Sequence, residues 1–139
     1  MGTERLMKVQ GWGIAVLRVV VGIVFVAHGA QKLFVWGFGA VAGFLGQVGI
    51  PVAMLAAIVV TLVECLGGLV LLVGLFTRWA GGLLAVDMLV AILAVHLKAG
   101  FFLPNGFEFA LTLLAASAAL ALLGSGEASL DAVLERRAA

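Results

Sequence analysis

Apolar residues dominate four long segments of the chain, and each run is close to the length of a membrane-spanning helix. A helix that crosses about 30 Å of hydrocarbon needs about 20 predominantly apolar residues. The segments cover residues 12–34, 52–76, 79–97 and 107–123, of which the last is the shortest. This pattern predicts an all-α membrane protein, in which one domain over residues 1–139 forms a bundle of four transmembrane helices.

Two shorter segments have the pattern of surface helices. Between the first two spans, residues 37–51 read GFGAVAGFLGQVGIP, which places Val41, Phe44, Leu45 and Val48 on one face of a short helix. We expect this amphipathic helix to lie in the membrane interface, with Pro51 starting the second span. The stretch GEASLDAVLERR predicts a C-terminal surface helix over about residues 129–137, with Ser129 as its N-cap.

Composition agrees with a membrane protein and argues against several other classes. The 139 residues are 65% hydrophobic and include 19 glycines, and the mean hydropathy is +1.30. A soluble domain must cover its surface with polar side chains, and 8 basic and 7 acidic residues are too few for that. A net charge of +1 and a single cysteine argue against nucleic-acid binding, disorder and a disulfide scaffold. Cys65 has no partner thiol, so thiol–disulfide chemistry within the chain is excluded.

The basic residues near the span ends predict an orientation. Five lie on one side of the membrane, namely Arg5, Lys8, Arg78, Arg136 and Arg137, and two lie on the other, Lys32 and Lys98. The positive-inside rule therefore places both termini in the cytoplasm of a multi-pass cell-membrane protein. A cleaved signal peptide is the competing interpretation of the first segment. Its apolar run is longer than usual for a signal peptide and contains Arg18, which favours a retained span.

Three ionisable residues of the predicted spans, Arg18, Glu64 and Asp87, lie between the predicted cytoplasmic ends and the membrane midplane. A charge at a span centre costs about 2.5–3.5 kcal/mol on insertion scales, so each should face the bundle interior. Their depths agree within roughly 8 Å, and we therefore expect Arg18 to pair with Asp87 or Glu64. A lone arginine between two carboxylates would leave one of them free to bind a proton. A structural ion cluster and a proton-handling or ligand-binding site are both consistent with this pattern.

A second polar group gathers at the predicted outer ends of the spans. Its members are His28, Lys32, His96, Lys98, Asn105 and Glu108. Alternative interpretations remain open for several of them. Lys32 and Lys98 could extend to lipid head groups, and Asn105 and Glu108 could stabilise the start of the fourth span.

The two histidines raise the question of a haem or a metal ion. Their depths differ by roughly 6 Å, which facing axial ligands would have to absorb. His96 is nine residues from Asp87, so the two point to opposite sides of an ideal helix and should not face one site. No further ligand pattern converges on them, and we therefore expect neither a haem nor a metal site.

Five glycines in the first two spans have the spacing of helix-packing positions: Gly22, Gly29, Gly67, Gly68 and Gly74. Small residues let helices approach closely in lipid. The first two share a face with Arg18 and Lys32, and Gly68 lies one turn from Glu64. The polar residues of these spans should therefore point inward. Gly81 and Gly82 could serve the third span or a homo-oligomer contact.

Five stretches, taken in order, carry a family resemblance over about Leu17 to Leu134: LRVVVGIVFVAHGAQKLF, GIP, VECLGGLVLLVGLFTRWA, PNGFEFALTLLAA and GSGEASLDAVL. Together they resemble the DoxX family of small four-helix membrane proteins. The resemblance implies a membrane subunit of a quinone-linked oxidoreductase, such as thiosulfate:quinone oxidoreductase, or a membrane partner of soluble redox-defence enzymes. The chain has no flavin or iron–sulfur motif, so redox chemistry would depend on a bound quinone or on a soluble partner protein.

Three functions follow from these patterns. The first is a quinone-linked redox subunit, whose candidate binding residues are Arg18, His28, Lys32, Glu64, Asp87, Asn105 and Glu108, none of them singled out as catalytic. The second is a small proton-coupled transporter that uses Glu64. The third is a membrane scaffold that anchors a soluble redox enzyme through Arg78 and the C-terminal helix. The bias of basic residues weighs against a transporter that inserts in both orientations, and mid-membrane carboxylates weigh against a pure anchor. We therefore expect the redox subunit.

Overall fold

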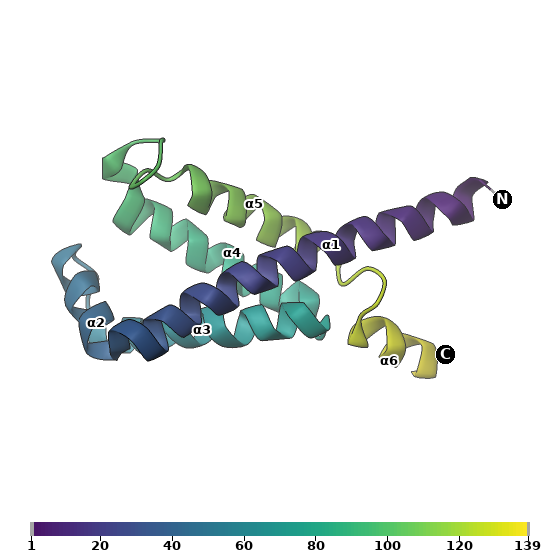
Figure 1. Cartoon of the computed structure of the whole chain (residues 1–139), viewed down its shortest axis with the longest axis horizontal. Coiled ribbons are helices and arrows are strands. Elements are labelled where there is room, and N and C mark those ends of the chain that lie inside the picture. Colours follow the sequence, from purple (N-terminus) through teal and green to yellow (C-terminus); the bar gives the residue numbers. More distant parts are fainter. Residues whose placement is uncertain (1, 139) are drawn as a thin grey trace.

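The computed structural model describes residues 2–138, and in this range every regular element is helical (Figure 1). The predicted all-α fold class is confirmed. The elements in order are α1 (Gly2–Ala30), η1 (Gln31–Trp36), α2 (Gly37–Gln47), α3 (Ala53–Val73), α4 (Thr77–Ala91), η2 (Ile92–His96), η3 (Leu97–Ala99), α5 (Glu108–Leu123) and α6 (Leu130–Ala138). The segments η1 and η2 are π-helical turns.

Three helical stretches of the described chain are long and apolar enough to cross a membrane: Gly2–Gln47, Ala53–Val73 and Thr77–Ala99. The remaining apolar helix, α5, is shorter. Many large apolar side chains face outward, including Val59 and Leu66 on α3, as expected when lipid rather than water surrounds the helices. The chain is therefore a membrane protein with several apolar helices.

The helices form two pairs, since α1 runs beside α3 and α4 runs beside α5 (Figure 1). Both ends of the chain lie on the side where α3 ends and α4 begins. We call this side the terminal end and the opposite side, where α2 lies, the distal end. The first helix is longer than predicted, because it begins at residue 2 and projects beyond the bundle at the terminal end.

Glycines bring the helices of each pair close together. A Cβ atom on Gly68 of α3 would lie 2.7 Å from the backbone nitrogen of Val26, and one on Gly22 of α1 would lie 2.9 Å from the Gly68 carbonyl oxygen. A Cβ atom on Gly29 would lie 2.6 Å from Cys65. Contacts this short leave no room for a side chain, so α1 and α3 touch through their backbones. Gly67 of α3 faces Leu84 of α4, and a Cβ atom on this glycine would lie 3.2 Å from the leucine side chain.

The short helix expected between the first two spans is present as α2. Its Val41 and Ala42 are buried against Ala57 of α3, with Leu45 beside them. Phe44, which shares the predicted apolar stripe, is 49% exposed. The helix changes direction at Gly37, whose φ of +75° is in the left-handed region that glycine tolerates.

Arg18 is buried at the terminal end, where its guanidinium group binds only backbone carbonyl oxygens. Its Nη1 donates to Leu71 and Leu72 at 2.6 and 2.8 Å, and its Nε and Nη2 donate to Ser125 and Ala128 at 3.0 Å each. The first two carbonyls belong to the last turn of α3, where few carbonyls have intrahelical donors, and that of Leu71 also accepts a hydrogen bond of 3.1 Å from the backbone nitrogen of Gly74. The predicted pairing of Arg18 with Asp87 or Glu64 is wrong, because these carbonyls occupy four of its five N–H groups.

Two further charged residues hold the terminal end together. Asp131 of α6 accepts hydrogen bonds from the backbone nitrogens of Phe76 and Thr77, at 2.8 and 3.1 Å, and so caps the start of α4. Arg78 donates to the carbonyl oxygen of Leu122 at 2.5 Å, in the last turn of α5. Each charge has the sign that its helix end favours, since helix N-termini attract anions and C-termini attract cations.

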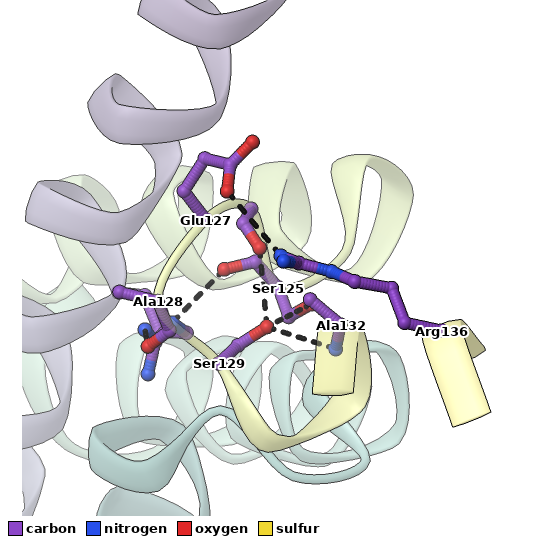
Figure 2. A network of polar contacts seen from close by, with 8 residues as sticks. Ser125, Glu127, Ala128, Ser129, Ala132 and Arg136 are labelled. Atoms are coloured by element: carbon purple, nitrogen blue, oxygen red, sulfur yellow. Dashed lines mark hydrogen bonds and ion pairs between the residues drawn. The ribbon is translucent and has the colours of Figure 1, made fainter. Parts of the chain in front are cut away.

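A network of short polar contacts fixes the loop between α5 and α6 (Figure 2). The Oγ atom of Ser129 donates to Gly126 or Ser125 and accepts a hydrogen bond of 3.1 Å from the backbone nitrogen of Ala132. The predicted N-cap role of Ser129 is thereby confirmed. Arg136 lies 3.6 Å from Glu127 across the same loop. The C-terminal helix is therefore held in a defined position against the bundle.

Candidate functional site

Lys32 and Glu64 form an ion pair inside the bundle. Lys32 lies in η1 and Glu64 in the middle of α3, and the Lys32 Nζ atom donates to Glu64 Oε2. The Glu64 side chain is 5% exposed and that of Lys32 is 16% exposed. The close contact of Gly29 with Cys65 brings these two residues to the same level, because the neighbouring helices run in opposite directions. Glu64 therefore has its counter-charge on the α1 side of the bundle, but from Lys32 rather than from Arg18.

Asp87 brings a second carboxyl group to this ion pair from α4. Its side chain lies beside Glu64. Its Oδ2 atom is buried and has no hydrogen-bond partner among the described residues. Buried polar atoms in proteins normally have a partner, so an orphaned one suggests a binding or catalytic role. We call Lys32, Glu64 and Asp87 the polar triad.

The polar triad lines a cavity of about 870 Å³ at the distal end. Both helix pairs, together with α2, contribute to the walls, which are mostly aliphatic and aromatic. The ionisable side chains on the lining are the triad, His28 and His96. A mostly apolar cavity with a few convergent polar groups is the usual form of a site for a small organic ligand.

Both histidines are held in one orientation by the main chain. The Nδ1 atom of His28 lies 2.9 Å from the carbonyl oxygen of Val24, and that of His96 lies 3.0 Å from the carbonyl oxygen of Asn105. A carbonyl oxygen can only accept, so Nδ1 carries the proton in each ring, and the neutral ring has Nε2 as an acceptor. His28 also lies against Phe109, with ring centroids 6.2 Å apart. Each histidine can therefore accept a hydrogen bond from a ligand in the cavity.

The expectation that His96 and Asp87 cannot face one site is wrong, because both line this cavity. The reason is the π-helical turn Ile92–His96, which lies between them. A π turn contains more residues than an α turn, so each residue advances the side-chain direction by a smaller angle. An ideal α-helix would place His96 opposite Asp87, and the π turn rotates it back toward the cavity.

Asn105 and Glu108 do not line the cavity. The Glu108 carboxylate accepts a hydrogen bond of 2.7 Å from the backbone nitrogen of Leu103 and so stabilises the loop before α5. Asn105 contributes its backbone carbonyl to His96, and Phe107 rather than Asn105 occupies the N-cap of α5. Of the seven residues named from the sequence, the structure brings four to the cavity: His28, Lys32, Glu64 and Asp87. Among the described residues, no three metal-ligating side chains cluster closely enough to hold a metal ion.

The ion pair of Lys32 with Glu64 was missed from the sequence, although a signal for it exists. Gly22 and Gly29 of α1 contact Gly68 and Cys65 of α3. Antiparallel pairing in that register places Lys32, one turn beyond Gly29, beside the turn that carries Glu64. Aligning the packing glycines of α1 with those of α3 in antiparallel register would therefore have identified Lys32 as the partner of Glu64.

Chemically, the site can donate hydrogen bonds from an ammonium group, accept them on carboxylate and imidazole groups, and exchange protons. Lys32 is paired with Glu64 alone, so within residues 2–138 the neighbouring carboxyl of Asp87 has no counter-charge of its own. Apolar surroundings disfavour an unpaired charge, and the neutral form of that carboxyl has a proton to give. The remaining lining is suited to an apolar ligand.

Comparison with known proteins identifies the family. The DoxX family profile matches residues 13–97. A Bacillus subtilis protein named "Putative oxidoreductase CatD" is 40% identical over 119 residues, which cover 86% of this chain and 84% of that protein. A Mycobacterium tuberculosis protein, "Uncharacterized membrane protein Rv3486", is 34% identical over 146 residues, which cover 96% of this chain and 89% of the relative.

A Haemophilus influenzae protein described as uncharacterized is 33% identical over 132 residues, which cover 92% of this chain and 95% of the relative. No solved structure matches the chain at a significant level. Residues 13–97 of this chain, which the profile matches, contain Lys32, Glu64 and Asp87, so the polar triad lies inside the matched region. This chain belongs to the DoxX family of membrane proteins.

Proposed function

We propose that this protein is the membrane component of a quinone-linked oxidoreductase and that the quinone head group binds at the polar triad. One observation carries the proposal: the orphaned Oδ2 atom of Asp87 lies beside the ion pair of Lys32 and Glu64 in a mostly apolar cavity. The relative named as an oxidoreductase supports redox chemistry in general. The identity of the electron carrier rests on the fit of the cavity.

The residues fit a quinone in both polarity and size. A quinone has two carbonyl oxygens on a flat apolar ring, and a hydrogen-bond donor at one oxygen fixes its orientation. Lys32 offers such a donor from its ammonium group, and the aliphatic walls accommodate the ring. The volume of about 870 Å³ is in the range of cavities that hold organic ligands and cofactors.

The polar triad also suits the proton requirement of the reaction. Reduction of a quinone to a quinol takes up two electrons and two protons, and the electrons come from a soluble redox partner. Lys32 stabilises negative charge that develops on the oxygen it binds. The carboxyl group of Asp87 transfers one proton to a quinone oxygen. It is then reprotonated from water at the distal surface through His28 or His96, whose Nε2 atoms accept the proton first, and a second cycle of the same steps supplies the second proton. Glu64 keeps Lys32 in position through the ion pair.

We further propose that the chain crosses the membrane four times with both termini in the cytoplasm. The bias of basic residues toward the terminal end supports this orientation. The helix α5 has 16 residues, or about 24 Å at 1.5 Å per residue, and the preceding apolar loop extends its reach. In this orientation the cavity lies in the outer half of the membrane.

Quinone binding by the purified protein tests the proposal. We expect quinone to co-purify and a quinone titration to be saturable. Asp87→Asn should raise the Kd roughly 10- to 100-fold, the effect of one hydrogen bond to a charged or acidic group. Asp87 has no ion-pair partner among the described residues, so this variant should fold normally. Glu108→Gln is the matched control, because Glu108 lies near the cavity without lining it. Absence of saturable binding, or equal affinity in Asp87→Asn and wild type, would refute the proposal.

A small proton-coupled transporter is the second candidate, and the same pair of carboxyl groups supports it. Glu64 and Asp87 lie side by side and only Glu64 is paired with a lysine, so a proton could exchange there for a substrate. That function needs water in the cavity, whereas quinone chemistry needs lipid access. The environment of the cavity therefore separates the two functions.

A further inference from the structure

The cavity is bounded partly by side chains that also face the outside of the bundle. Val59 of α3 and Val86 of α4 line it and are 51% and 60% exposed. Leu83 and Val90 of α4 line it as well and are 59% and 50% exposed. Val86 is the immediate neighbour of Asp87 and so lies at the level of the polar triad, and Leu83 and Val90 flank it within about one turn of α4. The surroundings of apolar helices at this level are lipid chains.

The cavity is bounded differently on the two sides of the polar triad. Gly67 of α3 meets Leu84 of α4 directly on the terminal side of the triad, which closes the cavity there. Beyond the triad, the buried contacts of α2 with α3 form a separate cluster from the main core. Residues of the distal halves of α3 and α4 line the cavity, and Figure 1 shows the two helices diverging in this direction.

We propose that the cavity opens sideways to the lipid between α3 and α4, and that the apolar tail of the bound quinone leaves through this opening. The proposal rests on the proposed function and specifies its ligand: a membrane-resident quinone with a long tail, which enters from the bilayer. We call the opening between Val59 and Val86 the lateral opening.

The distribution of polarity supports this occupant. The charged groups lie at the inner end of the cavity, with Glu64 only 4% exposed, and aliphatic side chains line the way out. A ligand with a polar head and an apolar tail matches this order. A wholly polar substrate from water would have to cross the aliphatic part of the lining with its polar groups unpaired. The tail also keeps its own surface in lipid, so no tail-sized pocket inside the protein is needed.

A bulky side chain at the lateral opening tests the position of the tail. In Val86→Trp, the indole should obstruct the opening and raise the Kd of a long-tailed quinone by at least about tenfold. A tailless quinone with the same head group should keep its affinity within about twofold. Leu89→Trp is the matched control, because Leu89 faces outward on α4 but does not line the cavity. Unchanged affinity for the long-tailed quinone, or equal weakening of both quinones, would overturn the proposal.

A second measurement needs no quinone. A nitroxide label at Ala91→Cys, in a Cys65→Ala background, places a probe on the half-buried lining of the cavity. In lipid bilayers, we expect dissolved oxygen to relax this label as strongly as one at Leu93, which faces outward. A water-soluble nickel chelate should have little effect, in contrast to its effect on a label at Arg136.

These two measurements distinguish a failure of the proposed quinone function from a failure of the lateral opening. Strong relaxation of the Ala91 label by the nickel chelate would show a water-filled cavity and overturn the lateral opening. If wild-type protein binds neither quinone while the label reports lipid, the opening stands and the quinone function fails. If quinone binds and Val86→Trp does not discriminate between the two tail lengths, the quinone function stands and the opening fails.

Discussion

Breaking the ion pair of Lys32 with Glu64 should destabilise the protein strongly. The expected loss of unfolding free energy follows from how deeply the two side chains are buried. Lys32→Met removes the cation beside a Glu64 side chain that is 5% exposed. Loss of one partner of a buried ion pair typically costs about 3–5 kcal/mol, because the other charge stays buried without compensation. Lys32 itself is 16% exposed, so water reaches part of the site and we expect a value near about 3 kcal/mol. That corresponds to roughly a hundredfold change in the unfolding equilibrium.

The assay is reversible unfolding in detergent micelles, followed by circular dichroism, on a double-mutant cycle. Glu64→Met should also destabilise, whereas Lys32→Met combined with Glu64→Met should recover to within about 1 kcal/mol of wild type, since no unpaired charge remains in the pair. Lys98→Met is the control for loss of a lysine at the exposed distal surface, with an expected change within about 0.5 kcal/mol. Additive effects in the double variant would refute the ion pair as the cause of the destabilisation.

Three further predictions concern packing and the terminal end. Gly81→Ala should destabilise the protein by about 1–3 kcal/mol, because a Cβ atom at residue 81 would lie 2.8 Å from backbone atoms of α5. Gly82 has open space around it, so Gly82→Ala should be neutral or stabilising in the same unfolding assay. Asp131→Ala should cost about 0.5–2 kcal/mol through loss of the α4 cap and should speed proteolytic release of α6, whereas the exposed Glu135→Ala should change neither. Arg18→Lys should destabilise the protein by about 2–4 kcal/mol in thermal unfolding, because one ammonium group cannot reach all four carbonyls. Each buried carbonyl left unpaired costs about 1–3 kcal/mol. A melting temperature equal to that of the wild type would contradict this reasoning.

The helices were predictable because the apolar runs are long and because a few residues mark their ends. Long apolar segments in lipid must satisfy their backbone groups internally, and helices do so. Ser129 predicted its own helix start because the cap is a local hydrogen bond to Ala132, three residues away. The spacing of Gly22 and Gly29 predicted a packing face because close approach of helices in lipid depends on small residues.

The residues that form the site were harder to predict, because the directions in which their side chains point do not follow from the helical period alone. Estimating how deep each residue lies in the membrane from its position in the sequence treats each span as a straight α-helix. The π turns at Gln31–Trp36 and Ile92–His96 break that assumption. The partners of Arg18 leave no trace in the sequence, since every residue has a backbone carbonyl and side-chain identity does not mark which ones are free. We expected Arg18 to pair with a carboxylate on charge alone, but in the structure it binds carbonyl oxygens at the end of α3 and in the loop after α5.

The position of Arg18 sets an order for the biogenesis of the protein. Its four carbonyl partners all come later in the chain, the nearest 53 residues after it and the farthest 110. When the first span reaches the membrane, the guanidinium group has none of them and must stay at the hydrated membrane surface. Only the arrival of the C-terminal loop completes its coordination. Synthesis of the loop between α5 and α6 is therefore the step that locks the first helix in place, and shortening the chain before Ser125 should leave that helix poorly retained in the bilayer.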